Sequence, residues 1–99
     1  MIQTIADALA KQGYESLTPV QEAVTDPALT DADLLVSAQT GSGKTVAFGL
    51  AIAPTLLGDR EKFGHAGAPL ALIIAPTREL AMQVSRELTW LYSEAGAVV

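Results

Sequence analysis

One short segment, AQTGSGKT at residues 38–45, limits what this chain can fold into more than any other. It follows an apolar run, LLVSA at residues 34–38, and precedes a helix-forming segment that begins near Gly43. Its glycines, Gly41 and Gly43, let the backbone turn where a Cβ would be in the way. A short apolar run, a tight loop and a helix in this order predict an α/β fold class in which helices flank a parallel sheet.

The rest of the chain continues this alternation of helices and strands. Helices are predicted over residues 2–12, from Thr18 to the residues before Pro27, over residues 43–57 and over residues 76–96; strands are predicted at residues 34–38 and 70–75, and residues 97–99 as the start of a third. The strands are assigned from short apolar runs and the helices from apolar residues at helical spacing. Residues 58–69 are polar and contain glycine, so we expect an exposed loop there.

Several helix ends have local signals. Gly13 is in the position of a C-terminal capping glycine. Thr18 can cap the second helix, Pro19 suits its first position, and Gln21 follows at capping-box spacing. In the third helix, Pro54 cannot donate a backbone hydrogen bond, so we expect a kink or an early end. In the fourth helix, an apolar stripe is formed by Leu80, Val84, Leu88 and Leu91, and Gly96 is predicted to end it.

Composition excludes several classes of protein. The chain has 99 residues, which suits one domain. It has no cysteine, so disulfides and thiolate metal sites are excluded. It has neither a basic-then-apolar leader nor an apolar run long enough to span a membrane, so we expect a cytoplasmic protein. The net charge of −5 argues against binding of nucleic acid by bulk electrostatics, while a few local contacts stay open.

The glycine-rich segment fits the chemistry of a phosphate loop. The general pattern is G-x-x-x-x-G-K-[ST], and here Ala38 replaces its first glycine. Backbone N–H groups of such a loop and the N-terminus of the following helix attract phosphate. Lys44 would neutralise the phosphates, and the Thr45 hydroxyl would bind Mg²⁺. The phosphates of a nucleotide and Mg²⁺ are therefore the predicted ligands, and an ordinary turn between strand and helix is the alternative.

Three segments together resemble the DEAD-box RNA helicases. GYESLTPVQ (13–21), AQTGSGKT (38–45) and PTREL (76–80) are similar to the Q motif, motif I and motif Ia of that family, in the same order. The resemblance covers almost the whole chain. It implies a partial RecA-like phosphate-loop domain: a Q-motif region at residues 1–27, the phosphate-loop strand and helix at 34–57, and a second strand with the motif Ia helix at 70–96.

The resemblance also implies roles for single residues. Gln21 would bind the adenine edge and select ATP over GTP, because an amide offers a donor beside an acceptor. Tyr14 and Thr18 would shape that pocket. The phosphates would be wrapped by Thr40, Gly41, Ser42, Gly43, Lys44 and Thr45, and RNA would meet a turn made by Pro76, Thr77, Arg78 and Glu79. Considered alone, Gln21 is a capping residue and Arg78 a solvated one. Trp90 and Tyr92 are predicted to be packing residues.

The motifs of phosphoryl transfer are incomplete in these residues. No Asp-Glu-Ala-Asp segment that could hold Mg²⁺ occurs among them, and no segment rich in arginine. We therefore expect the N-terminal part of a first helicase domain, inactive alone in hydrolysis and unwinding, with weak or no RNA binding. The alternatives are a stand-alone nucleotide-binding or interaction module without catalysis, and another phosphate-loop enzyme such as a small kinase. The RNA target and protein partners are not predicted.

Overall fold

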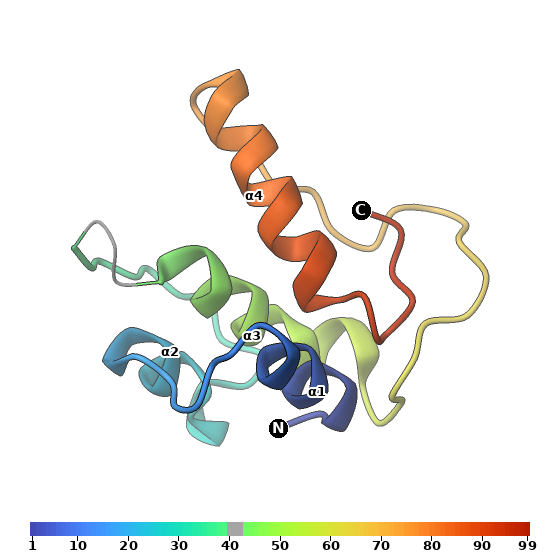
Figure 1. Cartoon of the computed structure of the whole chain (residues 1–99), viewed down its shortest axis with the longest axis horizontal. Coiled ribbons are helices and arrows are strands. Elements are labelled where there is room, and N and C mark those ends of the chain that lie inside the picture. The colour runs from blue at the N-terminus through green and yellow to red at the C-terminus, as the bar shows by residue number, and fades with distance from the viewer. Residues whose placement is uncertain (40–42) are drawn as a thin grey trace.

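The structure, a computed structural model, describes residues 1–39 and 43–99. Its elements are α1 (Gln3–Lys11), α2 (Pro19–Val24), the 3-10 turn η1 (Pro27–Leu29), α3 (Lys44–Leu57) and α4 (Arg78–Leu91). Helix α3 is central, because it contacts both α2 and α4, while α1 contacts α4 (Figure 1). None of the helices in the described residues is long and apolar enough to cross a membrane.

The core lies where α1, α3 and α4 meet. It consists of Ile5, Leu9, Val46, Leu50, Ala53, Leu57, Leu88, Leu91, Tyr92 and Ala95. Gly49 of α3 lets α4 come close, because a Cβ built there would lie 2.6 Å from Leu91 Cδ2 and 3.0 Å from Leu88 Cδ2. At the same place the Tyr92 hydroxyl donates a 2.6 Å hydrogen bond to the Gly49 carbonyl oxygen. Burial raises the pKa of Tyr92, so the phenol stays protonated.

The local signals at the end of α1 and the start of α2 are confirmed. Gly13 has a φ of 82°, and its N–H and that of Tyr14 donate to the carbonyls of Ala10 and Leu9. This pair of bonds is the Schellman motif that satisfies the last carbonyls of α1. Thr18 caps α2 within a complete capping box. Pro54 lies inside α3, which continues to Leu57, so the expected early end was wrong; buried Leu57 anchors that last turn in the core.

The predicted strands do not form a sheet. Over the described ranges the chain has no strand, and residues 34–38, 70–75 and 97–99 belong to neither helix nor strand. Their apolar side chains point into solvent: Leu35 is 101% exposed, Leu72 85% and Ile74 84%. A strand needs a neighbouring backbone to pair with its N–H and C=O groups, and these segments form no such pairing within the described residues. The α/β prediction therefore holds for the helices and is not confirmed for the parallel sheet.

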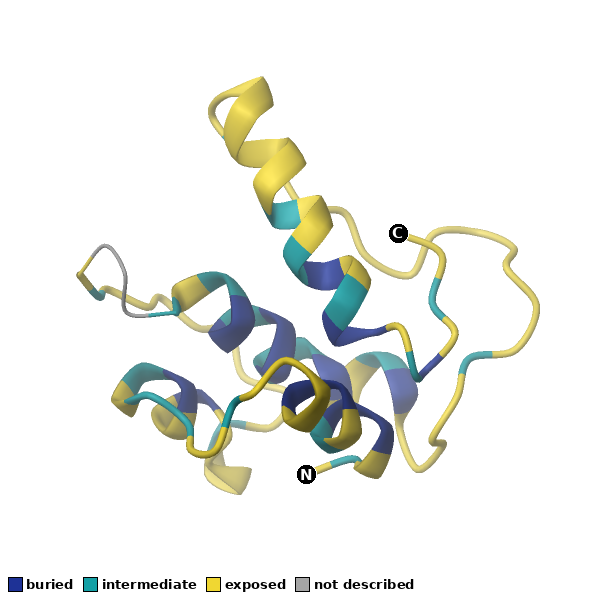
Figure 2. Cartoon of the chain, in the orientation of Figure 1, coloured by how far each residue is buried: buried dark blue, intermediate teal, exposed yellow. Residues whose placement is uncertain are grey.

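Helix α4 is shorter and less buried than its apolar stripe predicts. It ends at Leu91, before Gly96, and turns follow. Leu88 and Leu91 are buried, whereas Leu80 is 43% exposed. Figure 2 shows the N-terminal half of α4 projecting away from the other helices. Val84 packs partly on the core, so the stripe lacks a partner at its N-terminal end, at Leu80.

The predicted exposed loop at residues 58–69 is confirmed, and it is tied to other parts of the chain. Glu61 Oε1 accepts a 3.1 Å hydrogen bond from the Thr4 backbone N–H, and the Glu61 carbonyl oxygen accepts one of 2.7 Å from the Thr4 hydroxyl. Ile2, the N-cap residue of α1, makes no side-chain capping bond. Glu61 therefore caps α1 from a distant part of the chain. Phe63 adds a 2.9 Å backbone bond to the Ala95 carbonyl.

A matched pair of glycine substitutions tests the close approach of α3 and α4. We expect Gly49→Ala to lower the free energy of unfolding by at least about 1 kcal/mol, because overpacking outweighs the better helix propensity of alanine. Gly64→Ala is the control, since a Cβ there would meet nothing within 4 Å. Urea unfolding followed by helical circular dichroism measures both. A Gly49→Ala midpoint at or above that of Gly64→Ala would contradict the packing.

Candidate nucleotide site

The candidate site begins at the N-terminus of α2. The Thr18 hydroxyl accepts a hydrogen bond of 3.4 Å from the Gln21 backbone N–H, and Gln21 Oε1 accepts one of 3.0 Å from the Thr18 backbone N–H. Pro19 occupies the first turn, where the absence of an N–H costs nothing. This reciprocal capping fixes the direction of the Gln21 side chain.

The Gln21 side chain reaches across to the start of α3. Its Nε2 donates a 3.2 Å hydrogen bond to the Gly43 carbonyl oxygen, which also accepts the Ala47 N–H at 3.0 Å. Gln21 is 0% exposed, although glutamine is seldom fully buried. The proposed adenine-side residue and the last glycine of the phosphate loop are therefore in direct contact. Sequence spacing gave no signal for this contact across 22 residues.

Gly43 is required by this contact. It is the N-cap of α3, with a left-handed φ of 83°, a conformation that favours glycine. A Cβ at this position would overlap Gln21 Nε2. Lys44 and Thr45 follow in the first turn of α3, with the Lys44 side chain exposed and Thr45 half-buried. Lys44 is thus free to meet an anion at the positive end of a 14-residue helix.

The other residues predicted for the nucleotide site fall into two groups. Thr40, Gly41 and Ser42 lie outside the described residues. Tyr14 is half-buried and stacks on Trp90 of α4, with ring centroids 5.6 Å apart. Trp90 was expected only to pack; its position beside a Q-motif residue is what sequence analysis missed, because nothing in the spacing pairs residues so far apart.

The predicted RNA-facing residues lie at the projecting end of α4. Pro76, Thr77, Arg78 and Glu79 are all exposed. The Thr77 hydroxyl caps α4 by accepting a 3.2 Å hydrogen bond from the Leu80 N–H, and Glu79 lies in the first turn, where a negative charge is favourable. No hydrogen bond or ion pair within residues 1–39 and 43–99 joins them to Gln21 or Gly43. They form a separate surface.

Comparison with known proteins agrees with the motifs. The family model described as DEAD/DEAH box helicase matches residues 18–99. DEAD-box ATP-dependent RNA helicase 53 of Oryza sativa subsp. japonica is 49% identical over 83 residues, which cover 84% of this chain and 14% of that protein. DEAD-box ATP-dependent RNA helicase 9, mitochondrial, of Arabidopsis thaliana is 45% identical over 83 residues, with the same coverage.

A solved structure is similar over nearly the whole chain. The RNA helicase Prp28 from Chaetomium thermophilum, crystallised with ADP, matches with a TM-score of 0.80 and 37% identity, covering 98% of this chain and 23% of that one. This chain belongs to the DEAD/DEAH box helicase family. It spans only a small part of these relatives, 14% of the first.

The substitution Gly43→Ala tests whether this position must lack a side chain to make room for the Gln21 amide. Gly13→Ala is the matched control, because Gly13 has nearly the same φ, 82° against 83°, and open space around its Cβ. Both variants lose about 1–2 kcal/mol to left-handed strain. We expect Gly43→Ala to lose about 1 kcal/mol more, because the buried Gln21 amide is displaced.

A double-mutant cycle isolates that extra loss. In a Gln21→Ala background, Gly43→Ala should cost no more than Gly13→Ala does in the same background, because the amide is absent. Urea unfolding gives all the values. If the extra loss persists without the Gln21 side chain, the contact is not its cause.

Proposed function

We propose that this chain is the ATP-binding segment of a DEAD-box RNA helicase, in which ATP binding and hydrolysis are coupled to remodelling of RNA duplexes. The observation that carries the proposal is the hydrogen bond from Gln21 Nε2 to the Gly43 carbonyl oxygen. It joins the residue suited to an adenine edge to the loop suited to phosphate. Family membership and the likeness to an ADP-bound helicase support the same assignment.

The Gln21 amide has enough hydrogen-bonding capacity for both tasks. A primary amide has two N–H donors and an oxygen with two lone pairs. One donor is used by Gly43 and one acceptor site by the Thr18 N–H. The remaining donor and acceptor suit adenine N7 and N6. Because Gln21 is 0% exposed, its neighbours must move before a base can reach it.

Lys44 and Thr45 would serve the phosphate end. The exposed Lys44 ammonium would neutralise the β- and γ-phosphates, while backbone N–H groups at the start of α3 would face them. Mg²⁺ prefers oxygen ligands and usually keeps several waters, so one protein hydroxyl beside nucleotide phosphates is an adequate donor set. The Thr45 hydroxyl is that donor. When bound, Mg²⁺ would offset the phosphate charge.

RNA would meet the projecting start of α4. Arg78 and the first N–H groups of α4 are exposed and suited to a strand phosphate, beside Pro76, Thr77 and Glu79. With a net charge of −5, these contacts alone would hold RNA weakly.

We also propose that residues 1–99 bind nucleotide without hydrolysing it, since the acidic segment that phosphoryl transfer needs is not among them. The cytoplasmic location stays a prediction.

A second candidate is an interaction module without catalysis. Exposed apolar side chains at Leu35, Leu72 and Ile74 favour it, because such groups mark contact surfaces when they gather in patches. Under this proposal the Gln21–Gly43 contact is structural, and no nucleotide is needed. Nucleotide binding therefore separates the two candidates.

A thermal melt with Mg-ADP tests the proposed function. Free ligand at 100 times its dissociation constant adds about 2.7 kcal/mol to the stability of the folded state. For a chain of this length that raises the midpoint by roughly 10 °C or more. We expect Mg-ADP to raise it and Mg-GDP not to, because guanine presents two acceptors, N7 and O6, where adenine presents an acceptor and a donor, so the Gln21 amide oxygen would find no donor.

Lys44→Ala is the variant for the same melt. Its exposed side chain makes the unliganded fold insensitive to the change, so the shift with Mg-ADP should shrink while the unliganded midpoint stays. Equal shifts with ADP and GDP would contradict the role of Gln21. No shift with either nucleotide would favour the interaction module.

A further inference from the structure

Tyr14 is held firmly at the point where the chain leaves α1. Its backbone N–H donates a 3.0 Å hydrogen bond to the Leu9 carbonyl, and the preceding Gly13 N–H donates one of 3.0 Å to the Ala10 carbonyl. In a Schellman motif the residue in this position packs against the last turn of the helix. Tyr14 is accordingly half-buried against the core cluster. The first residues after α1 therefore have a fixed place.

Trp90 supplies the other side of that place. The rings of Tyr14 and Trp90 are 5.6 Å apart between centroids and inclined by 27°, an offset-stacked arrangement. Trp90 Nε1 donates a 2.9 Å hydrogen bond to Glu87 Oε2, one turn earlier on α4. The indole is thus held by α4 and half-buried. Its orientation sets the position of the Tyr14 ring.

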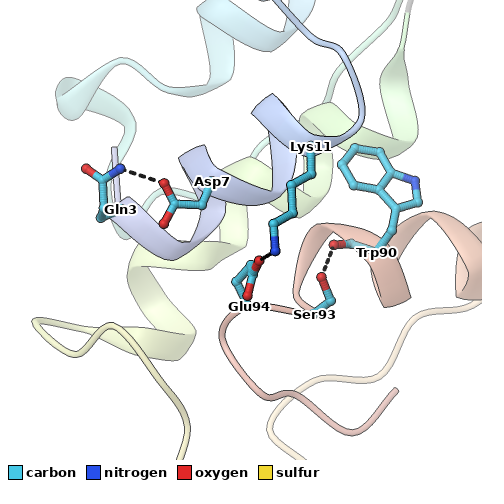
Figure 3. A network of polar contacts seen from close by, with 6 residues as sticks. All are labelled: Gln3, Asp7, Lys11, Trp90, Ser93 and Glu94. Atoms are coloured by element: carbon cyan, nitrogen blue, oxygen red, sulfur yellow. Dashed lines mark hydrogen bonds and ion pairs between the residues drawn. The ribbon is translucent and has the colours of Figure 1, made fainter.

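A second tie joins the same two helices nearby. Lys11, in the last turn of α1, forms an ion pair with Glu94, just after α4. Figure 3 shows Lys11 and Trp90 at this junction, with Glu94 and Ser93 beside them. The Ser93 hydroxyl donates a 2.8 Å hydrogen bond to the Trp90 carbonyl oxygen. The Lys11–Glu94 ion pair is exposed, and solvent screens its charges. The stacked rings of Tyr14 and Trp90 are therefore the stronger link between the two helices.

The chain then runs a short distance to the nucleotide site. Thr18 is four positions after Tyr14, with three residues between them, a span of at most about 14 Å even when fully extended. Thr18 and Gln21 cap one another, and Gln21 Nε2 binds the Gly43 carbonyl. The segment between α1 and α2 is therefore held at both ends: by Trp90 at Tyr14, and by Gly43 at Gln21.

We infer that Trp90 is a positioning residue for nucleotide binding: through Tyr14 it sets where Thr18 and Gln21 lie beside the phosphate loop. The inference rests on the proposed function, since it concerns the same site. Loss of the indole frees Tyr14, and the short segment then carries that freedom to the Thr18–Gln21 capping box. Binding would have to restore the order, so affinity falls.

The test uses the full 99-residue chain and titration calorimetry with Mg-ADP. Trp90→Leu removes the ring and keeps an apolar side chain, and Trp90→Phe keeps a ring that can stack. Val84→Ala is the structural control, because Val84 is a half-buried residue of the same helix that packs on the core. We expect Trp90→Leu to bind Mg-ADP about threefold to tenfold more weakly, the range of aromatic pair energies.

The other variants show whether the effect is specific. Trp90→Phe should bind within about twofold of the wild type, because stacking survives. Val84→Ala should lose stability and keep its affinity. Unchanged affinity in Trp90→Leu, or an equal loss in Val84→Ala, would overturn the inference. In either case the wild type still binds, and the proposed function stands.

A second measurement uses only the wild-type protein, so it does not depend on whether a variant folds. Trp90 is the single tryptophan of the chain, so emission after excitation selective for tryptophan reports on the surroundings of this one indole, which include the Tyr14 ring. Saturating Mg-ADP should change that emission in the wild type, and Mg-GDP should not. Binding by calorimetry with unchanged emission would overturn the role of Trp90 and leave the nucleotide site intact. Absence of binding in calorimetry would overturn both.

Discussion

Helices α3 and α4 meet at Gly49, and the rest of the structure depends on this meeting. Because Gly49 has no side chain, Leu88 and Leu91 come within contact of the α3 backbone. The Tyr92 hydroxyl then satisfies the Gly49 carbonyl inside the core. This hydrogen bond is buried. Polar groups are tolerated in a core when they are hydrogen-bonded, as these two groups are. The C-terminal half of α4 is thereby fixed on α3, and α1 contacts α4.

The candidate site and the fold share their contacts. Gln21 is at once a capping residue of α2, a buried side chain and the partner of Gly43. Substitution at Gln21 therefore changes stability as well as any binding, and the two effects separate only through matched variants. The same holds for Trp90, which joins α4 to the segment after α1. The nucleotide binding proposed for this scaffold would therefore depend on how the helices are packed.

The helices could be predicted from sequence because their signals are local. Gly13, Thr18 and Gln21 act within one turn, and each has the predicted role at a helix end. Lys44 and Thr45 likewise follow the glycine loop at the start of α3, as the motif requires. What the sequence could not show was contact between distant residues: Gln21 with Gly43, Tyr14 with Trp90, and Glu61 with Thr4. Neither the composition nor the spacing of apolar residues indicates which distant residues come into contact.

The predicted strands were not confirmed, for a related reason. Residues 70–75 have the apolar, β-branched character of a buried strand, yet Leu72 and Ile74 are exposed. A helix satisfies its own backbone, whereas a strand does so only with a neighbour, so strand formation is a property of the pair. A cavity of about 630 Å³ lies between α3 and these segments, lined by Phe48, Ile52 and Leu56 with Leu34, Val36 and Leu70. These apolar residues thus lie beside α3, without forming a strand in the described residues.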